Sequence, residues 1–225
     1  ILGINPYRTP LDIYREKTTE ITEDRAPSEA AYWGTQLESI VAQEFSKRTG
    51  FMIQRVYHQL ASNLDHYIGT STPTQWALAV INHRISADVR LTNPASIWNV
   101  QKLMLTTDTL LECKTANALM AEHWGLSQEA EIIKREITSK HKIPLYYETQ
   151  VQWYMAVTAA KLCYVAVLIG GQDFRIYAVD RNESIIQMIA TRCFDFWMKH
   201  VRAGVPPEPI IDDDVKNLLQ KYLDV

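Results

Sequence analysis

Leu111-Glu112-Cys113-Lys114-Thr115 is the stretch of sequence that decides the fold of this 225-residue chain. Its apolar flanks predict a β-strand, in which side chains two positions apart point to the same face of the sheet. Glu112 and Lys114 then lie side by side, a carboxylate suited to a metal ion and an ammonium suited to a water molecule or a phosphate. The pairing favours hydrolysis of a phosphodiester, although Glu-x-Lys alone is common on solvated protein surfaces.

The composition is that of an ordinary globular chain. It is 47% hydrophobic and 22% charged, with a formal net charge of -3. This apolar content is sufficient for one sizeable core, so we expect a single domain over residues 1–225. Nucleic-acid-binding domains are usually basic, and this net charge does not indicate one. A local basic channel or a bound metal ion can nevertheless offset a neutral total.

The cysteines and the apolar runs argue against several other classes. Cys113, Cys163 and Cys193 are far apart and include no Cys-x-x-Cys pair, which disfavours a zinc site, an iron–sulfur cluster and a disulfide framework. A reducing cytoplasm fits this usage. No apolar run reaches the roughly 18 residues of a membrane span, so no membrane association is expected. The chain opens at Ile1 rather than Met, in mid-pattern, and we expect further residues to precede it.

Helix and strand patterns alternate along the chain. A long helix is expected over residues 29–49, between a Ser28 cap and Gly50, and its apolar stripe is Trp33, Leu37, Ile40, Val41 and Phe45. Other helices are expected over residues 11–17, 128–140, 146–161 and 183–203, and strands over 51–58, 61–69, 110–115, 163–169 and 174–179. The tail, residues 206–225, is expected to contain a short helix packed on a partner. This order predicts an α/β fold with a central mixed β-sheet flanked by helices.

Two glutamates of the 29–49 helix are candidates for a cleft. Projected at about 100° per residue, Glu38 falls beside Val41 and Phe45 at the edge of the apolar stripe, while Glu44 falls within it. The projection does not choose between them. Lys134, Arg135, Lys140 and Lys142 form a basic run, which is interpreted as a solvated face with a DNA path as the alternative.

Four short motifs occur in a characteristic order: Trp33-Gly34-Thr35-Gln36-Leu37-Glu38, Ser62-Asn63-Leu64-Asp65, Leu111-Glu112-Cys113-Lys114 and Gln150-Val151-Gln152. Together with the opening Leu2-Gly3-Ile4-Asn5-Pro6-Tyr7, this set resembles the YqaJ-like viral recombinase family, which is related to lambda phage exonuclease. The resemblance extends from Ile1 to about Pro209. It implies a PD-(D/E)xK restriction-endonuclease-like core.

The resemblance also implies a metal site. Asp65 and Glu112 match the metal-binding carboxylates, and the main-chain carbonyl of Cys113 matches a further ligand. Glu38 matches the helix acid that completes the site, directly or through water. Lys114 matches the lysine that orients or deprotonates the attacking water. The ions expected there are one or two Mg²⁺, with Mn²⁺ as a substitute.

Four other residues match family positions close to DNA. Gln150 and Tyr147 match catalytic positions near the scissile phosphate. Gln152 matches the second glutamine of its motif, and Arg8 matches an arginine at the terminal 5′-phosphate, so both are expected to bind DNA.

The activity implied by the resemblance is that of a metal-dependent 5′-to-3′ double-strand DNA exonuclease. Such an enzyme serves phage or prophage recombination and leaves 3′ single-stranded tails. The implied partners are double-stranded DNA ends, a single-strand annealing protein and further copies of the chain in a homotrimeric ring, all in the cytoplasm of a bacterial host. The alternatives are an endonuclease or single-strand nuclease of the same fold, and a non-catalytic DNA-binding or assembly subunit.

The chain departs from the family pattern between Asp65 and Glu112. The family usually joins these two positions by a short hairpin, whereas here residues of about 70–109 form an expected insertion. Asp88 and Asp108 lie in this interval and are alternatives to Asp65. We prefer Asp65 because Asn63-Leu64-Asp65 matches the family's sequence motif and Thr107-Asp108-Thr109 does not.

Overall fold

The computed structural model describes residues 1–19, 28–55, 59–61, 78–80, 83–85, 109–208 and 213–223. The expected metal ligand Asp65 and its alternatives Asp88 and Asp108 lie outside the described residues, as do most of the expected insertion and most of the strand expected over 61–69.

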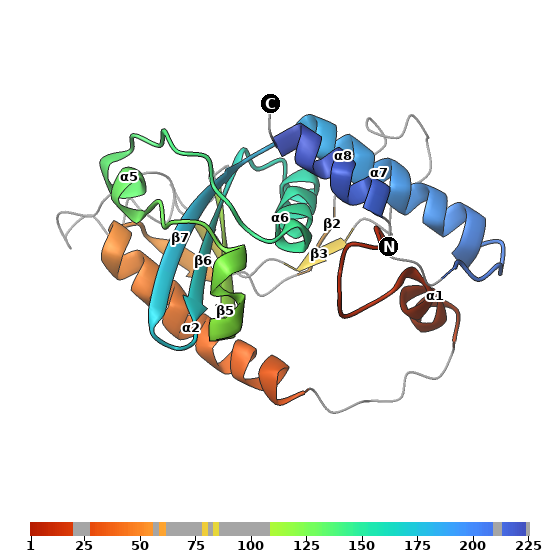
Figure 1. The fold of residues 1–225 in the computed structure, drawn as a ribbon, viewed down its shortest axis with the longest axis horizontal. Helices are drawn as coiled ribbons and strands as arrows, with labels where there is room; N and C mark the ends of the chain where they lie inside the picture. Colours follow the sequence, from red (N-terminus) through yellow and green to blue (C-terminus); the bar gives the residue numbers. More distant parts are fainter. Residues whose placement is uncertain are drawn as a thin grey trace.

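A mixed β-sheet forms the centre of the fold (Figure 1). Its strands are ordered β1 (Ile53–Arg55), β4 (His83–Ile85), β5 (Thr109–Ala116), β6 (Leu162–Ile169) and β7 (Asp173–Asp180). The pair β5 and β6 is parallel, whereas the other neighbours are antiparallel. A separate short pair joins β2 (Gln59–Ala61) to β3 (Leu78–Val80). The predicted α/β class with a central mixed sheet is confirmed.

Two helices cover opposite faces of this sheet (Figure 1). Leu111 and Cys113 of β5 pack in one core with Val41 and Phe45 of α2 (Glu29–Thr49). Leu110 of β5 packs in the other core, together with residues of α6 (Leu145–Thr158). The two-residue alternation of the strand therefore divides the apolar interior into two layers.

The remaining helices surround this three-layer centre. They are α1 (Pro10–Thr18), the 3₁₀ segment η2 (Ala118–His123), α5 (Glu129–Lys134), α7 (Glu183–Phe196), the π-helical turn η3 (Trp197–Val201) and α8 (Asp213–Leu223). Within the described part of the chain, none of these elements combines the length and apolar character needed to cross a membrane.

The ends of α2 agree with the prediction, but its predicted stripe is partly wrong. Ser28 Oγ accepts a hydrogen bond from the Ala31 N–H, and Gly50 ends the helix with a positive φ of 73°. Trp33 and Ile40 are each 55% exposed, although both were assigned to the stripe. The buried face consists of Val41, Ala42, Phe45 and Thr49. Gly34 lies on the side of α2 near β5, where its nearest neighbour is the Thr115 side chain.

Two other elements differ from the sequence-based expectation. The helix expected over 128–140 stops at Lys134, because Arg135 adopts a left-handed conformation with φ 60°. The tail does form a helix, α8, and the structure shows it packed on its own chain, while packing on a partner stays a prediction. Leu219 is buried in a cluster with Ile4, Ile185 and Ile189, and Figure 1 shows α8 lying along α7.

Glu131 explains the early end of α5. Its carboxylate accepts hydrogen bonds from the Ser139 and Thr138 N–H groups at 2.9 and 2.6 Å, and from the Ser139 hydroxyl at 2.7 Å. These bonds tie Glu131 to residues of the loop that follows α5, where the sequence alone predicted more helix. They also lower the pKa of Glu131 from 4.5 to about 2.

Glu131→Gln is expected to lower the melting temperature by a few degrees at pH 7. A carboxyl whose pKa is depressed by folding adds stability above its ordinary pKa, and this stability is lost as pH falls towards the folded value. The deficit of the variant should therefore shrink between pH 5 and pH 2, in the range set by the two pKa values. Thermal denaturation across this range measures it, with Glu136→Gln as the control in the same loop. A deficit that stays constant with pH would contradict the assignment.

Candidate active site

Glu112 and Lys114 lie together on the face of the sheet that α6 covers. Strand β5 pairs with β6 so that Glu112 stands beside Val165 and Lys114 beside Val167, two residues of the core that contains α6. The Lys114 Nζ atom is 2.6 Å from Glu112 Oε1. The predicted strand and the predicted same-face arrangement of this pair are confirmed.

The Glu112 carboxylate is buried and only partly satisfied. The residue is 2% exposed, and its Oε2 atom has no hydrogen-bond partner among the residues that the structure describes. Burial raises the pKa of Glu112, the positive charge of Lys114 opposes that rise, and the negative charge of Glu38 adds to it. A buried oxygen without a partner is costly, and such atoms commonly mark a site for a ligand or an ion.

The structure distinguishes between the two candidate glutamates of α2. Glu38 lies close enough to Glu112 for its charge to raise the pKa of that carboxyl. Glu44 instead pairs with Arg48 at 2.7 Å and with Lys47 at 3.8 Å. Of the two, Glu38 is therefore the α2 carboxylate whose charge reaches Glu112, and its role as a metal ligand stays a prediction.

A cluster of aromatic rings also contacts the lysine. The Lys114 Nζ atom lies 4.7 Å from the centre of the Tyr147 ring, a cation–π distance. The Tyr147 ring is flanked by Tyr146 and Trp124, with centroid distances of 4.3 and 5.5 Å. Trp124 is buried and was missed by the sequence analysis. It lies just after the 3₁₀ segment η2, where no periodic pattern points to a site.

Tyr147 and Gln150 occupy one face of α6 with Tyr154. They recur at the three- and four-residue spacing of a helix face, and the Gln150 amide donates a hydrogen bond to the Tyr154 hydroxyl. Burial raises the pKa of Tyr154, and the charge of Glu112 raises it further. The structure thus brings Tyr147 and Gln150 together with Glu112, Lys114 and Glu38.

Gln152 lies on the other side of α6, inside the fold. Its side-chain nitrogen donates to Glu148 Oε1 and to the Asp180 carbonyl, and its side-chain oxygen accepts from the Asn182 N–H. The residue is buried. The predicted DNA contact of Gln152 is not supported, because its amide group already ties α6 to the end of β7.

Arg8 lies in the N-terminal segment, where it forms an exposed ion pair with Glu16 of α1. Its neighbour Tyr7 meets Tyr146 edge to face, with ring centres 6.5 Å apart. This contact places the segment beside the cluster of aromatic rings, while a 5′-phosphate contact by Arg8 stays a prediction.

The donors present suit a hard divalent cation. Glu112 and Glu38 supply carboxylate oxygens, and the Glu112 Oε2 atom is available for a bond to an ion. The Cys113 thiol is buried, and burial raises its pKa, so that a thiolate is not the expected ligand. In the described ranges no three His, Cys, Asp or Glu side chains form a metal cluster. The third expected carboxylate, Asp65, lies outside those ranges.

Comparison with known proteins gives the family of this chain. The family model of the YqaJ-like viral recombinase domain matches residues 1–161. The chain belongs to the YqaJ-like viral recombinase family. The resemblance of the four ordered motifs is therefore confirmed.

One relative within this family is the uncharacterized protein YqaJ of Bacillus subtilis strain 168. It is 29% identical over 209 residues, which cover 92% of this chain and 52% of the relative. The chain therefore spans about half the length of that relative. Among solved structures, the alkaline exonuclease LHK-Exo of Laribacter hongkongensis matches over 99% of this chain and 95% of its own, with 15% identity and a TM-score of 0.48. Its complex with dAMP matches with 16% identity and the same TM-score.

Tyr147→Leu is expected to release the Lys114 ammonium, whereas Tyr147→Phe keeps the ring and should retain it. In the metal-free wild-type protein, the ring current of Tyr147 should shift the Lys114 ε-methylene signal upfield of the other lysines. The Leu variant should move this signal towards the others, and the Phe variant should not. A carbon–proton correlation spectrum of lysine-labelled protein measures the shift, and Lys114→Arg assigns the peak. An unchanged peak in the Leu variant would refute the contact.

Proposed function

We propose that this member of the YqaJ-like family is a metal-dependent nuclease that hydrolyses DNA from an end. The observation that carries the proposal is the buried Glu112–Lys114 pair, with its 2.6 Å contact and a carboxylate oxygen that has no partner among the described residues. Membership of a viral recombinase family supports a role in phage or prophage recombination. The finer proposal is 5′-to-3′ digestion of one strand of double-stranded DNA, which leaves a 3′ single-stranded tail.

The proposed metal ligands are Glu112 and Glu38, with Asp65 and the main-chain carbonyl of Cys113 completing the set. Mg²⁺ is the expected ion, as one or two ions with Mn²⁺ as a substitute, since hard oxygen donors suit both. A bound ion would acidify a water molecule and offset the charge of the scissile phosphate.

The other site residues handle the water and the phosphate. Lys114 is proposed to orient the attacking water or accept its proton, and Glu112 and the Tyr147 ring hold its Nζ atom from two sides. Such restraint favours catalysis because misplacement of a reacting group by about 1 Å can cost about 100-fold in rate. Gln150 is proposed to donate to a phosphate oxygen, since its amide lies on the same face of α6 as Tyr147.

The proposed partners follow from this chemistry and from the family. Carboxylates, a lysine and an amide recognise phosphate and water, which carry no base sequence, so no sequence specificity is expected. Arg8 is proposed to contact the terminal 5′-phosphate. A homotrimeric ring around DNA, delivery of the tail to a single-strand annealing protein and action in the bacterial cytoplasm are further proposals.

Linear duplexes labelled at either end, with and without a 5′-phosphate, test the activity. With Mg²⁺, a 5′-to-3′ exonuclease releases the 5′ label as a nucleotide at once and leaves the unlabelled complement as a single strand. A closed circular plasmid and a single-stranded oligonucleotide serve as alternative substrates. Nicking of the circular plasmid would indicate an endonuclease. Preferential degradation of the single-stranded oligonucleotide would indicate a single-strand nuclease. Failure to degrade any substrate would favour a non-catalytic subunit and overturn the proposal.

Lys114→Ala is expected to reduce the rate of cleavage by about 10²–10⁴-fold, the usual contribution of a positioned acid–base group. Affinity for duplex DNA, measured by fluorescence polarisation without metal, should stay close to that of the wild type. Hydrolysis at a near-normal rate by this variant would remove Lys114 from the mechanism.

Glu112→Gln and Glu38→Gln are expected to weaken Mg²⁺ binding by about 10–100-fold or more, since changes even in the outer shell of a metal site have effects of this size. Glu44→Gln is the matched control on α2, because Glu44 pairs with Arg48 away from the site. Isothermal titration calorimetry compares the three variants in the absence of DNA. Equal losses in all three would show that the site does not bind the ion as proposed.

A further inference from the structure

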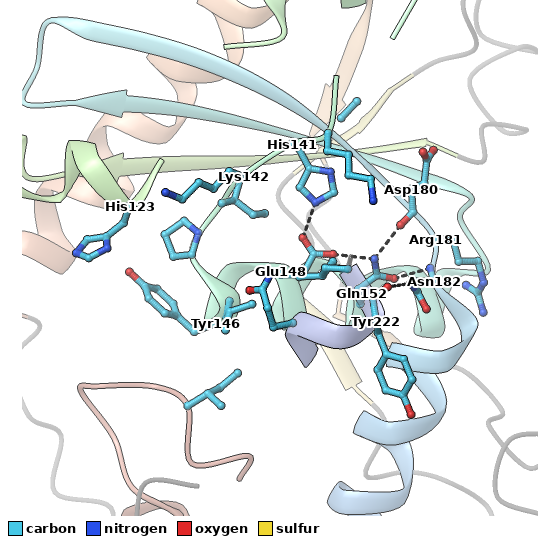
Figure 2. Close-up of a pocket in the computed structure, with 18 of the residues that line it drawn as sticks. His123, His141, Lys142, Tyr146, Glu148, Gln152, Asp180, Arg181, Asn182 and Tyr222 are labelled. Carbon is cyan, nitrogen blue, oxygen red and sulfur yellow. Dashed lines mark hydrogen bonds and ion pairs between the residues drawn. The ribbon is translucent and has the colours of Figure 1, made fainter. Parts of the chain in front are cut away.

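A cavity lies around the start of α6 (Figure 2). This cavity of about 1020 Å³ is lined by the N-terminal segment, residues 137–146, the end of β7 and the end of α8. Its volume is at the upper end of the range for small-molecule sites. None of the described residues of the proposed metal site lines it.

One wall of the cavity is a closed polar network. Glu148 is 1% exposed, and its two carboxylate oxygens meet His141 Nε2 at 2.8 Å and Gln152 Nε2 at 3.0 Å. Gln152 in turn bonds to the Asp180 carbonyl and the Asn182 N–H, as Figure 2 shows. Since these groups satisfy one another, the wall is already formed and the buried Glu148 carboxyl has a polar partner at each oxygen.

The rest of the lining combines cations with aromatic rings. His123, Lys140 and Lys142 are exposed at the cavity, and Asp180 is the remaining acid that faces them. Tyr7 is 73% exposed and meets the half-buried Tyr146 edge to face. Basic side chains that attract phosphate, beside aromatic rings that accept a base, are the combination that nucleotide-binding grooves use.

Tyr146 joins this cavity to the proposed active site. Its ring lies 4.3 Å from the ring of Tyr147, which in turn lies 4.7 Å from Lys114 Nζ. A molecule that rests on Tyr146 is therefore two side chains away from the proposed catalytic lysine.

We propose that the cavity binds a nucleotide unit, with its base against Tyr7 and Tyr146 and its phosphate near Lys142 and His123. The proposal rests on the proposed function only for the source of this nucleotide. Hydrolysis supplies a free mononucleotide, and an opened DNA end supplies an unpaired nucleotide within a strand. The shared chemistry is one anionic phosphate and one stackable base.

Binding measured without metal tests this proposal apart from hydrolysis. The probes are dTMP, thymidine and a short oligo(dT), titrated in EDTA into the wild type by calorimetry. We expect dTMP or oligo(dT) to bind, and thymidine to bind more weakly because it lacks the phosphate. Tyr7→Ala and Lys142→Glu should each weaken the binding about tenfold. Because both residues are exposed, the melting temperatures of the two variants should equal that of the wild type.

Two variants outside the cavity are the matched controls. Lys134→Glu makes the same charge change near the same loop, and Tyr32→Ala removes another exposed tyrosine. Both should bind dTMP as the wild type does. Binding of dTMP that depends on Tyr7 and Lys142 identifies the free mononucleotide as the ligand, and binding of oligo(dT) alone identifies the strand. No binding of either probe, or equal losses in cavity and control variants, would overturn the proposal. Absence of nuclease activity would leave this measurement unaffected.

Discussion

The parallel pairing of β5 with β6 is the constraint on which the rest of the structure depends. This register sets Glu112 and Lys114 beside Val165 and Val167, on the face covered by α6. It simultaneously directs Leu111 and Cys113 to the face covered by α2. A slip by one residue would exchange the two sets and leave the ion pair in the apolar core under α2. The hydrophobic residues of β5 thus fix the position of its charged ones.

The same pairing forces a carboxylate into a buried position, which is unfavourable for folding. An unsatisfied buried polar atom costs about 1–3 kcal/mol, and Glu112 also carries the repulsion of Glu38. Lys114 offsets part of this cost, and the two apolar layers on either side of the sheet supply the stability that tolerates it. Local unfavourable terms of this kind concentrate at functional sites, where a ligand relieves them.

Local signals predicted the elements whose ends are determined by neighbouring residues. Ser28 and Gly50 bound α2 as expected, and the strands around residues 110–115, 163–169 and 174–179 are confirmed. The sequence-based predictions were wrong or incomplete where contacts between residues far apart in the sequence determine the local structure. The Glu131 carboxylate accepts hydrogen bonds from residues seven and eight positions later, where a loop replaces the expected helix. Trp124 supports Tyr147 only because the chain returns through α6.

The Gln150-Val151-Gln152 motif shows that two residues of one matched motif can have different roles in the structure. On an α-helix, residues two apart are separated by roughly 200°, so two glutamines with this spacing cannot face the same ligand. Gln150 lies with Tyr154 on the side of Glu112, whereas Gln152 closes the Glu148 network on the other side. Each glutamine thus has its own physical role, one at the proposed catalytic face and one in the wall of the adjacent cavity. Because both faces belong to one helix, a shift of α6 caused by a ligand in the cavity would also move Tyr147 and, through its ring, Lys114.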